Sequence, residues 1–336
     1  MSGSGIAHGG GLAAAALLHG GRVEDWLDLS TGINPCPPAL GAIDPRAWHR
    51  LPDREREDAA RHAARSFYGC GANIPLPVPG TQAAIQLLPQ LLEKGARAAI
   101  LSPTYGEYAR CLARAGHDVD AVAGLDEIGP KHGLAVIVNP NNPTGRKIPA
   151  TSLLALAERM AATGGLLVVD EAFADAEPEF SLASHAATQP NLLIFRSFGK
   201  FFGLAGLRLG FVIAGPAIVQ AMSEALGPWP VSGPALSVAI DLFARGGSLV
   251  AARIAERRKA LQAVLDRHDM TVIGGTALFA LVEDERAQAL QEHLCRAHIL
   301  TRAFDYAPHW LRIGLAPDEA GDDRFDAALA AWKALA

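Results

Sequence analysis

The feature that most constrains the fold is a repeated alternation of short apolar stretches with helix-like stretches through the middle of the chain. The apolar stretches are residues 98–101, 134–138, 166–169 and 192–195. Continuous apolar strands separated by helices are typical of a mainly parallel sheet with helices on both faces. We therefore predict an α/β fold for this part of the chain.

The pattern changes beyond residue 214, where several helices are followed by short strands and further helices. A chain of 336 residues is longer than the roughly 250 to 300 residues that one hydrophobic core usually serves. We predict a large domain over residues 40–228 and a smaller α+β domain formed by residues 1–39 and 229–336. The N-terminal part of the smaller domain is predicted to close over a substrate.

Composition excludes several classes of protein. The net charge is −5, and Lys and Arg do not cluster with aromatic residues, so we expect no nucleic-acid partner. No stretch approaches the roughly 20 apolar residues of a membrane span, so we expect no membrane partner. We also expect no metal site. The four cysteines form no C-x-x-C pair, which favours a cytoplasmic protein.

A single lysine stands in the apolar stretch from Arg196 to Gly210, R-S-F-G-K-F-F-G-L-A-G-L-R-L-G. Apolar surroundings lower the pKa of an amine and favour its nucleophilic form, which makes Lys200 a candidate Schiff-base lysine. Ser197 and Arg208 offer a hydroxyl and a guanidinium suited to phosphate. On this motif alone, a surface lysine at a turn remains an equal alternative.

Polar turns follow the predicted strands. Gly80, Thr81 and Gln82 separate an apolar stretch from a predicted helix, which would place free N–H groups and the positive end of a helix dipole at one point. The turn lacks the glycine patterns of nucleotide-binding loops. Tyr105, Asn142 and Asp170 occupy comparable turns. Because ligands of parallel sheets bind beyond the strand ends, these residues are candidate site residues.

In this order, the turns and the lysine stretch resemble the fold-type I pyridoxal-phosphate enzymes, the aspartate aminotransferase group. The resemblance implies a large domain with a mainly parallel sheet of the seven-stranded type, pyridoxal 5'-phosphate as cofactor and a homodimer. It also implies roles for the matching residues. Lys200 would hold the cofactor and transfer protons, Asp170 would pair with the ring nitrogen, Asn142 would bind the phenolic oxygen and Tyr105 would stack on the ring. The cofactor phosphate would be bound by Gly80, Thr81, Gln82, Ser197 and Arg208.

Two positions depart from the family pattern. Many members have a tyrosine three residues after the ring aspartate, where this chain has Phe173. Many also have a tyrosine before the Pro-Asp of a loop that reaches the partner subunit's phosphate site, where this chain has Leu51. Both changes remove polar contacts to the cofactor.

Within this group, the chain looks most like histidinol-phosphate aminotransferases and the threonine-phosphate decarboxylases of cobalamin biosynthesis. The N-terminal H-G-G, the segment L-D-L-S-T-G-I-N-P from Leu27 to Pro35 and D-E-A-F from Asp170 are similar to the decarboxylase pattern. The resemblance implies decarboxylation of L-threonine O-3-phosphate to (R)-1-aminopropan-2-yl phosphate. The alternative is a histidinol-phosphate-type aminotransferase.

The resemblance also implies substrate contacts. Arg312, in W-L-R-I-G, looks like the family's carboxylate-binding arginine, and Arg324 falls near a second arginine that histidinol-phosphate enzymes use for phosphate. For Arg324, a solvated charge at a helix start is an equal alternative. The remaining predicted substrate contacts are His8, Gly32, Asn34 and Asn142.

Two further classes have less support. A pyridoxal-phosphate-binding regulator would carry a DNA-binding helix-turn-helix ahead of this body, and the region before Gly80 is short and not basic. A catalytically idle relative would not be expected to keep both Lys200 and Asp170.

Overall fold

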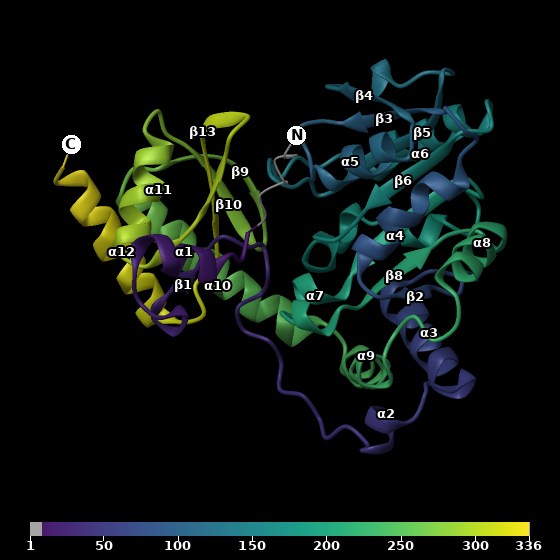
Figure 1. Ribbon diagram of the computed structural model, residues 1–336, viewed down its shortest axis with the longest axis horizontal. Helices are drawn as coiled ribbons and strands as arrows, with labels where there is room; N and C mark the ends of the chain where they lie inside the picture. The colour runs from purple at the N-terminus through teal and green to yellow at the C-terminus, as the bar shows by residue number, and fades with distance from the viewer. Residues whose placement is uncertain (1–8, 336) are drawn as a thin grey trace. The chain divides into compact units, whose positions relative to one another are not determined.

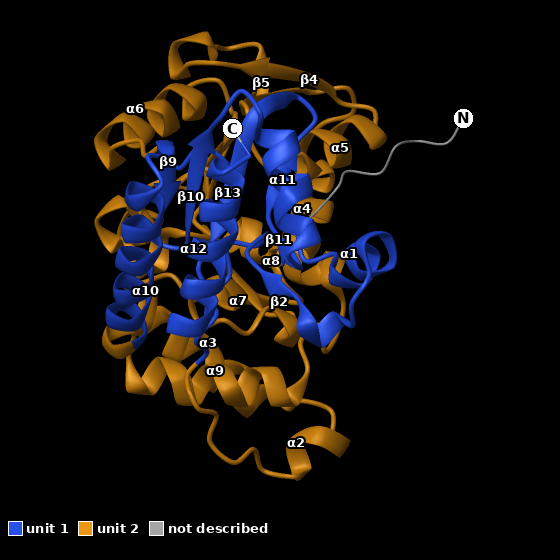
Figure 2. Cartoon of the chain, turned by 90° about the vertical axis from the view of Figure 1, so that its left-hand side faces the viewer, with its two compact units in different colours: residues 1–37, 143–145, 250–336 blue, residues 38–142, 146–249 orange. Residues whose placement is uncertain are grey.

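The computed structural model describes residues 9–335, which form two compact units (Figures 1 and 2). Of the described residues, unit 1 comprises 9–37, 143–145 and 250–335, and unit 2 comprises 38–142 and 146–249. The large domain, which the sequence predicts to end at residue 228, corresponds to unit 2 and extends to residue 249. It does so because helix α9 (Gly233–Arg245) packs on helix α3 (Arg54–Tyr68) within unit 2.

Unit 2 is built on a seven-stranded sheet. Only β8 runs antiparallel to its two neighbours, and the other pairs are parallel. This confirms the predicted α/β fold with a mainly parallel sheet. In sheet order, the strands are β2 (Leu76–Val78), β8 (Gly210–Ile213), β7 (Leu192–Ser197), β6 (Leu166–Asp170), β5 (His132–Val138), β3 (Arg97–Leu101) and β4 (Asp118–Val122).

Helices cover this sheet and bury its apolar side chains. The strand interiors are almost completely inaccessible, and α4, α5 and α8 share one continuous core with them. Helix α3 begins where the side chain of Asp53 accepts a hydrogen bond from the N–H of Arg56, and it ends at Gly69 in the left-handed conformation. The remaining helices of unit 2 are α2 (Arg46–His49), α4 (Thr81–Leu87), α5 (Glu107–Arg114), α6 (Ala150–Ala161), α7 (Phe198–Phe201) and α8 (Pro216–Leu226).

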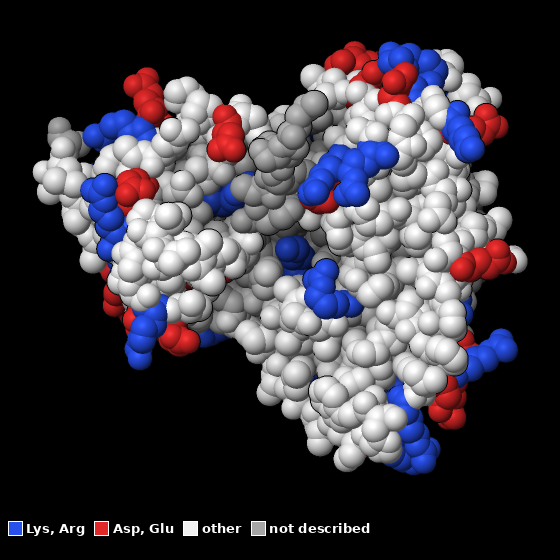
Figure 3. Space-filling model, in the orientation of Figure 1, with Lys and Arg blue, Asp and Glu red and all other residues white. Residues whose placement is uncertain are grey.

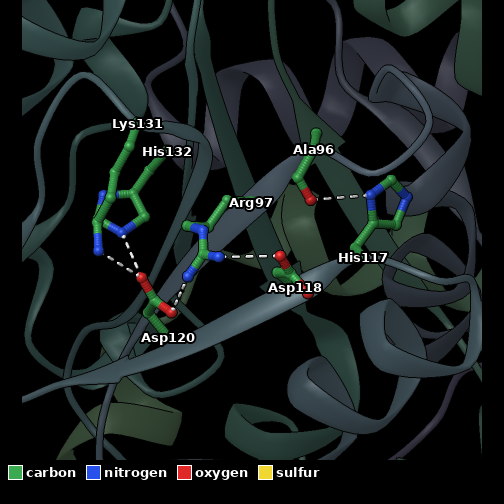
Figure 4. Close-up of polar contacts among 7 residues, drawn as sticks. All are labelled: Ala96, Arg97, His117, Asp118, Asp120, Lys131 and His132. Atoms are coloured by element: carbon green, nitrogen blue, oxygen red, sulfur yellow. Dashed lines mark hydrogen bonds and ion pairs between the residues drawn. The ribbon is translucent and has the colours of Figure 1, made fainter.

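An ion network ties together the amino ends of β3, β4 and β5 (Figure 4). Arg97 donates to Asp118 at 2.9 Å and to Asp120 at 2.8 Å, while Lys131 and His132 also contact Asp120. The N–H of Gly129 donates to Nδ1 of His132, so the proton of neutral His132 lies on Nε2 and faces Asp120. The hydrogen bonds from Lys131 and His132 lower the pKa of Asp120 to about 2. The candidate site residues Asp170 and Ser197 lie at the opposite, carboxyl ends of β6 and β7.

Unit 1 is an α+β unit, as predicted. Its four-stranded sheet is antiparallel throughout, and a short parallel pair joins β1 to β11. The four-stranded sheet has the order β12 (Arg302–Phe304), β13 (Ala307–Gly314), β10 (Phe279–Glu283) and β9 (Thr271–Thr276). The short pair is β1 (Leu27–Asp28) and β11 (Ile299–Leu300), and the helices are α1 (Leu12–His19), α10 (Ser248–Arg267), α11 (Ala287–Arg296) and α12 (Glu319–Lys333).

Surface charge is mixed. On the face shown in Figure 3, Lys and Arg are interspersed with Asp and Glu among uncharged residues. Within residues 9–335, no single helix is both long enough and apolar enough to cross a membrane.

Candidate active site

Asp170 is the last residue of β6, at the carboxyl end of the parallel strands, and its side chain is buried. Both carboxylate oxygens accept hydrogen bonds. Oδ1 accepts from the N–H of Ala172 at 3.0 Å, and Oδ2 accepts from Oη of Tyr108 at 2.7 Å. Burial raises the pKa of Asp170, while these two donors and the charge of Lys200 oppose that rise. Asp170 is therefore a fixed, buried carboxylate that a neighbouring cation would stabilise.

Lys200 follows the next strand of the sheet. Strand β7 ends at Ser197, and the chain turns at once into α7, where the buried Phe198 and Phe201 flank the lysine. The charge of Lys200 lowers the pKa of Asp170, so the two side chains lie within electrostatic range. The structure thus brings together the predicted Schiff-base lysine and the predicted ring-binding aspartate. The lowered pKa of Lys200 itself stays a prediction.

The predicted phosphate-binding residues converge near the start of α4. A side chain on Gly80, which has a φ of +78°, would come within 2.9 Å of Nη2 of Arg208. Ser197 is paired with Gly210 across β7 and β8, and a Cβ on Gly210 would lie 2.9 Å from the N–H nitrogen of Thr81. Arg208 is exposed and adopts a left-handed backbone with φ 53°. The N–H of Thr81, the guanidinium of Arg208 and the strand end at Ser197 therefore lie in one region, and together they offer donor types suited to phosphate.

Tyr105 is joined to this region by its hydroxyl, which donates to Oε1 of Gln82 at 3.2 Å. The amide of Gln82 in turn donates to Oε2 of Glu107 at 3.1 Å. Burial, followed by the charges of Glu107 and Asp170, raises the pKa of Tyr105 to about 12. The phenol is therefore protonated at neutral pH and serves as a fixed hydrogen-bond donor.

Asn142 lies in the loop that follows β5. The preceding residue, Asn141, anchors that loop: its Nδ2 donates to the carbonyl of Pro103 at 2.9 Å, and its Oδ1 accepts from Oγ1 of Thr104 at 2.7 Å. These bonds place the loop of Asn142 beside the loop that carries Tyr105. Asn142 is half-buried there, and the three residues after it are grouped with unit 1.

Arg312 is a buried cation of unit 1. Its Nη2 donates to the carbonyl of Ser30 at 2.6 Å, and its guanidinium lies 5.2 Å from the centre of the Phe279 ring. Burial, reinforced by the charge of Arg302, lowers the pKa of Arg312 to about 10. Arg302 is the direct partner of Arg312 in the register of β12 and β13, so two cations share one side of a sheet.

The predicted N-terminal substrate contacts lie in the same unit. His8 falls outside the described residues. The N–H of Gly10 donates to Oγ of Ser30 at 2.7 Å, so the glycine segment packs beside the residue that accepts from Arg312. Gly32 and Asn34 are buried a few residues further along, and Oδ1 of Asn34 accepts from the N–H of Cys36 at 2.9 Å.

Arg324 is held in place by backbone carbonyls of unit 1, and its predicted contact with a substrate phosphate stays a prediction. Its Nη2 donates to the carbonyls of Ala297 and His298, at 2.8 and 2.9 Å, just beyond the end of α11. Cations at the C-terminal end of a helix satisfy free carbonyls and the helix dipole. Arg302, and not Arg324, stands opposite Arg312.

Sequence reasoning missed two functional candidates, Tyr108 and Arg302. Tyr108 lies in the first turn of the helix that follows Tyr105, and its closeness to Tyr105 in sequence could have indicated it. Arg302 ends a predicted strand, but only the register of the hairpin shows that it faces Arg312. Of the two departures from the family pattern, Phe173 is buried and Leu51 is exposed.

Comparisons with known proteins show the family and the fold of this chain. Residues 24–329 match the family Aminotransferase class I and II. A threonine-phosphate decarboxylase from Sinorhizobium sp. is 59% identical over 97% of this chain and 98% of its own length, and one from Pseudomonas aeruginosa is 44% identical over 98% of each. The fold is similar to that of histidinol-phosphate aminotransferase from Sinorhizobium meliloti, solved with pyridoxal-5'-phosphate (TM-score 0.83, 23% identity, 97% of this chain and 95% of that one). The chain belongs to the class I and II aminotransferase family.

Proposed function

We propose that this protein is a pyridoxal-phosphate-dependent decarboxylase that converts L-threonine O-3-phosphate to (R)-1-aminopropan-2-yl phosphate, in cobalamin biosynthesis. The observation that carries the proposal is the 59% identity, over nearly the full length of both chains, to a threonine-phosphate decarboxylase. The paired cations Arg302 and Arg312 agree with it, because the substrate has two anionic groups.

The residues present fit the cofactor. Lys200 would hold it covalently, and Asp170 would face its ring nitrogen as a buried carboxylate. Its phosphate would be bound by the N–H groups of Thr81 and Gln82 beside Gly80, with Ser197 and Arg208 completing the donor set. Asn142 and Tyr105 would contact the ring. Bound in this way, pyridoxal phosphate supplies an electron sink for the pair that remains on Cα when CO2 leaves.

The side chains that bind the substrate would determine which bond to Cα breaks. Arg312 would bind the substrate carboxylate in a bidentate manner, and Arg302 would bind the phosphate, which together fix the orientation of Cα. Asn34, Gly32 and His8 are proposed as further contacts. Lys200 would then deliver a proton to Cα, so that the C–COO⁻ bond is replaced by a C–H bond. Arg324, which donates to backbone carbonyls, would support the fold of unit 1.

A histidinol-phosphate-type aminotransferase is the alternative reaction on the same scaffold. It would use the same lysine to move a proton away from Cα, and it would need a 2-oxo acid as second substrate. The fold cannot separate the two reactions, because a histidinol-phosphate aminotransferase has the same fold. The choice therefore depends on the substrate anchors of unit 1 and on the sequence identity.

We also propose a cytoplasmic homodimer. Unit 2 exposes Trp48, Leu51 and Trp229 by 68, 66 and 55%. Trp48 lies in α2, Leu51 follows α2 and Trp229 precedes α9, and the two helices pack together. Large apolar residues that are exposed on neighbouring elements are typical of a protein interface. The four cysteines are free, which supports a reducing compartment.

Substrate competition tests the proposed reaction. The purified protein should turn over L-threonine O-3-phosphate with no 2-oxo acid present, and kcat/KM should exceed that for histidinol phosphate with 2-oxoglutarate by at least about 100-fold. Borohydride treatment of the yellow protein should attach the cofactor to the peptide that contains Lys200. A faster reaction with histidinol phosphate would replace the proposal with the aminotransferase.

A further inference from the structure

The hydroxyl of Tyr108 makes a contact that the site described so far does not use. Tyr108 lies in the first turn of α5 and is completely buried. Its Oη lies 2.7 Å from Oδ2 of Asp170. Burial, and then the charge of Asp170, raise the pKa of Tyr108 well above its ordinary value. The tyrosine therefore keeps its proton and acts as the donor in a charge-assisted hydrogen bond.

Asp170 depends on such donors to remain ionised. Burial favours its neutral form, and the neighbouring charge of Glu171 acts in the same direction. The groups that act against them are the Tyr108 hydroxyl, the N–H of Ala172 and the charge of Lys200. Lys200 is the proposed attachment residue, so its ammonium charge is lost to Asp170 once the cofactor is attached. Tyr108 then contributes the side-chain donor that remains.

We propose that Tyr108 is a positioning residue for the reaction: its hydroxyl holds Asp170 ionised and oriented, and so sets how strongly Asp170 binds a protonated ring nitrogen. The inference rests on the proposed function, because that function assigns Asp170 to the ring nitrogen. A phenylalanine at position 108 would leave a buried carboxylate with one donor fewer. A carboxyl group that takes up a proton no longer attracts a cation.

The experiment compares two cofactors on the apoprotein. One is pyridoxal phosphate, and the other is its deaza analogue, in which a C–H group replaces the ring nitrogen. Tyr108→Phe should weaken binding of pyridoxal phosphate by about 10- to 100-fold, the effect of losing one hydrogen bond to a charged group. It should change binding of the deaza analogue by no more than about twofold.

The other outcomes are distinct. Equal weakening of both cofactors would show that Tyr108 only supports the fold, and unchanged binding of both would show that it has no role; either result overturns the inference. A wild-type apoprotein that binds neither cofactor would instead overturn the proposed function.

Two further variants guard against a folding artefact. Tyr68→Phe removes another buried tyrosine hydroxyl, from a ring that lies under the Arg196 guanidinium at 4.6 Å, and it should leave the ratio of the two affinities unchanged. In an Asp170→Asn background, Tyr108→Phe should cause no further loss of pyridoxal phosphate affinity. A full additional loss there would show that the hydroxyl does not act through Asp170.

Discussion

Arg302 and Arg312 are direct partners across the antiparallel strands β12 and β13, although both side chains carry a positive charge. Like charges in this position destabilise a sheet, and here burial adds to the effect, because Arg312 is only 7% exposed. Each guanidinium lies near an aromatic ring, Phe304 for Arg302 and Phe279 for Arg312. A bound anion would offset the repulsion between the two guanidinium groups, which supports the proposal that the pair binds the anionic groups of the substrate.

Substitution of the two arginines should separate their roles. Arg302→Gln and Arg312→Gln should each raise KM for threonine phosphate by about 10- to 100-fold, since each removes a charge-assisted contact. Steady-state kinetics with L-threonine, which lacks the phosphate, identifies the phosphate ligand: the Arg302 variant should show no additional loss with this substrate. Arg324→Gln is the control, and it should lower thermal stability without changing KM. An unchanged KM in both test variants would refute the assignment.

A side chain at Gly80 should be unfavourable for two reasons, the positive φ of its backbone and the closeness of the Arg208 guanidinium. Gly80→Ala places a methyl group within 2.9 Å of Nη2 of Arg208 and should weaken cofactor binding by about tenfold, equivalent to one charge-assisted contact. Gly95→Ala is a matched control, because Gly95 has a similar φ of +74° but no atom within 4 Å of its Cβ position. Equal cofactor affinities in the two variants, measured by titration of the apoprotein, would contradict the proposed phosphate site.

The free energy of unfolding of the apoprotein should depend on pH through the titration of Asp170. Because burial raises its pKa above the ordinary value of 3.8, the folded protein holds a proton at pH values where the unfolded chain has released it. The free energy of unfolding therefore falls as pH rises through that range. The stability of the wild type relative to Asp170→Asn should thus decline as pH increases from about 4. Urea midpoints measured across pH test this, and a constant difference would show that Asp170 is not perturbed.

A second buried charge cluster supports the two strand ends of the site. Arg196 precedes Ser197 and pairs with Glu171, which follows Asp170, at 2.6 Å, and with Asp175. Burial alone would lower the pKa of Arg196, but the charges of Asp175 and Glu171 raise it above its ordinary value. Arg196→Met would leave two buried carboxylates without their cation.

Arg196→Met should lower the free energy of unfolding by about 3–5 kcal/mol. Arg97→Met breaks a comparable pair of contacts in the half-exposed network of Figure 4 and should lower it by less than about 1 kcal/mol. Chemical denaturation of the two variants measures both values. Similar losses would show that the Arg196 cluster is no more than another surface network.

Much of the fold could be predicted because the central strands of unit 2 are continuously apolar. Strand β4 was missed, since it is an edge strand that carries Asp118 and Asp120 and lacks the apolar signal of its neighbours. The sequence near Trp229 indicates a break and predicts a domain boundary there, whereas the packing of α9 on α3 keeps that helix in unit 2.

The candidate site was predictable where a residue follows a strand directly. Asp170 and Ser197 are the last residues of β6 and β7, and residues at one end of parallel strands lie together whatever the loop lengths. Contacts that depend on register or rotamer could not be predicted. Arg302 faces Arg312 only through the pairing of a hairpin with an irregular register, and the hydroxyl of Tyr108 reaches Asp170 from 62 residues away in sequence.

The fate of the substrate carboxylate tests the account most directly. The protein should be incubated with L-threonine O-3-phosphate labelled at the carboxyl carbon, with pyridoxal phosphate and without any 2-oxo acid. The account predicts that all of the label is released as CO2, with one aminopropanol phosphate formed for each CO2. Label retained in a 2-oxo acid, or turnover that requires an added 2-oxo acid, would contradict it.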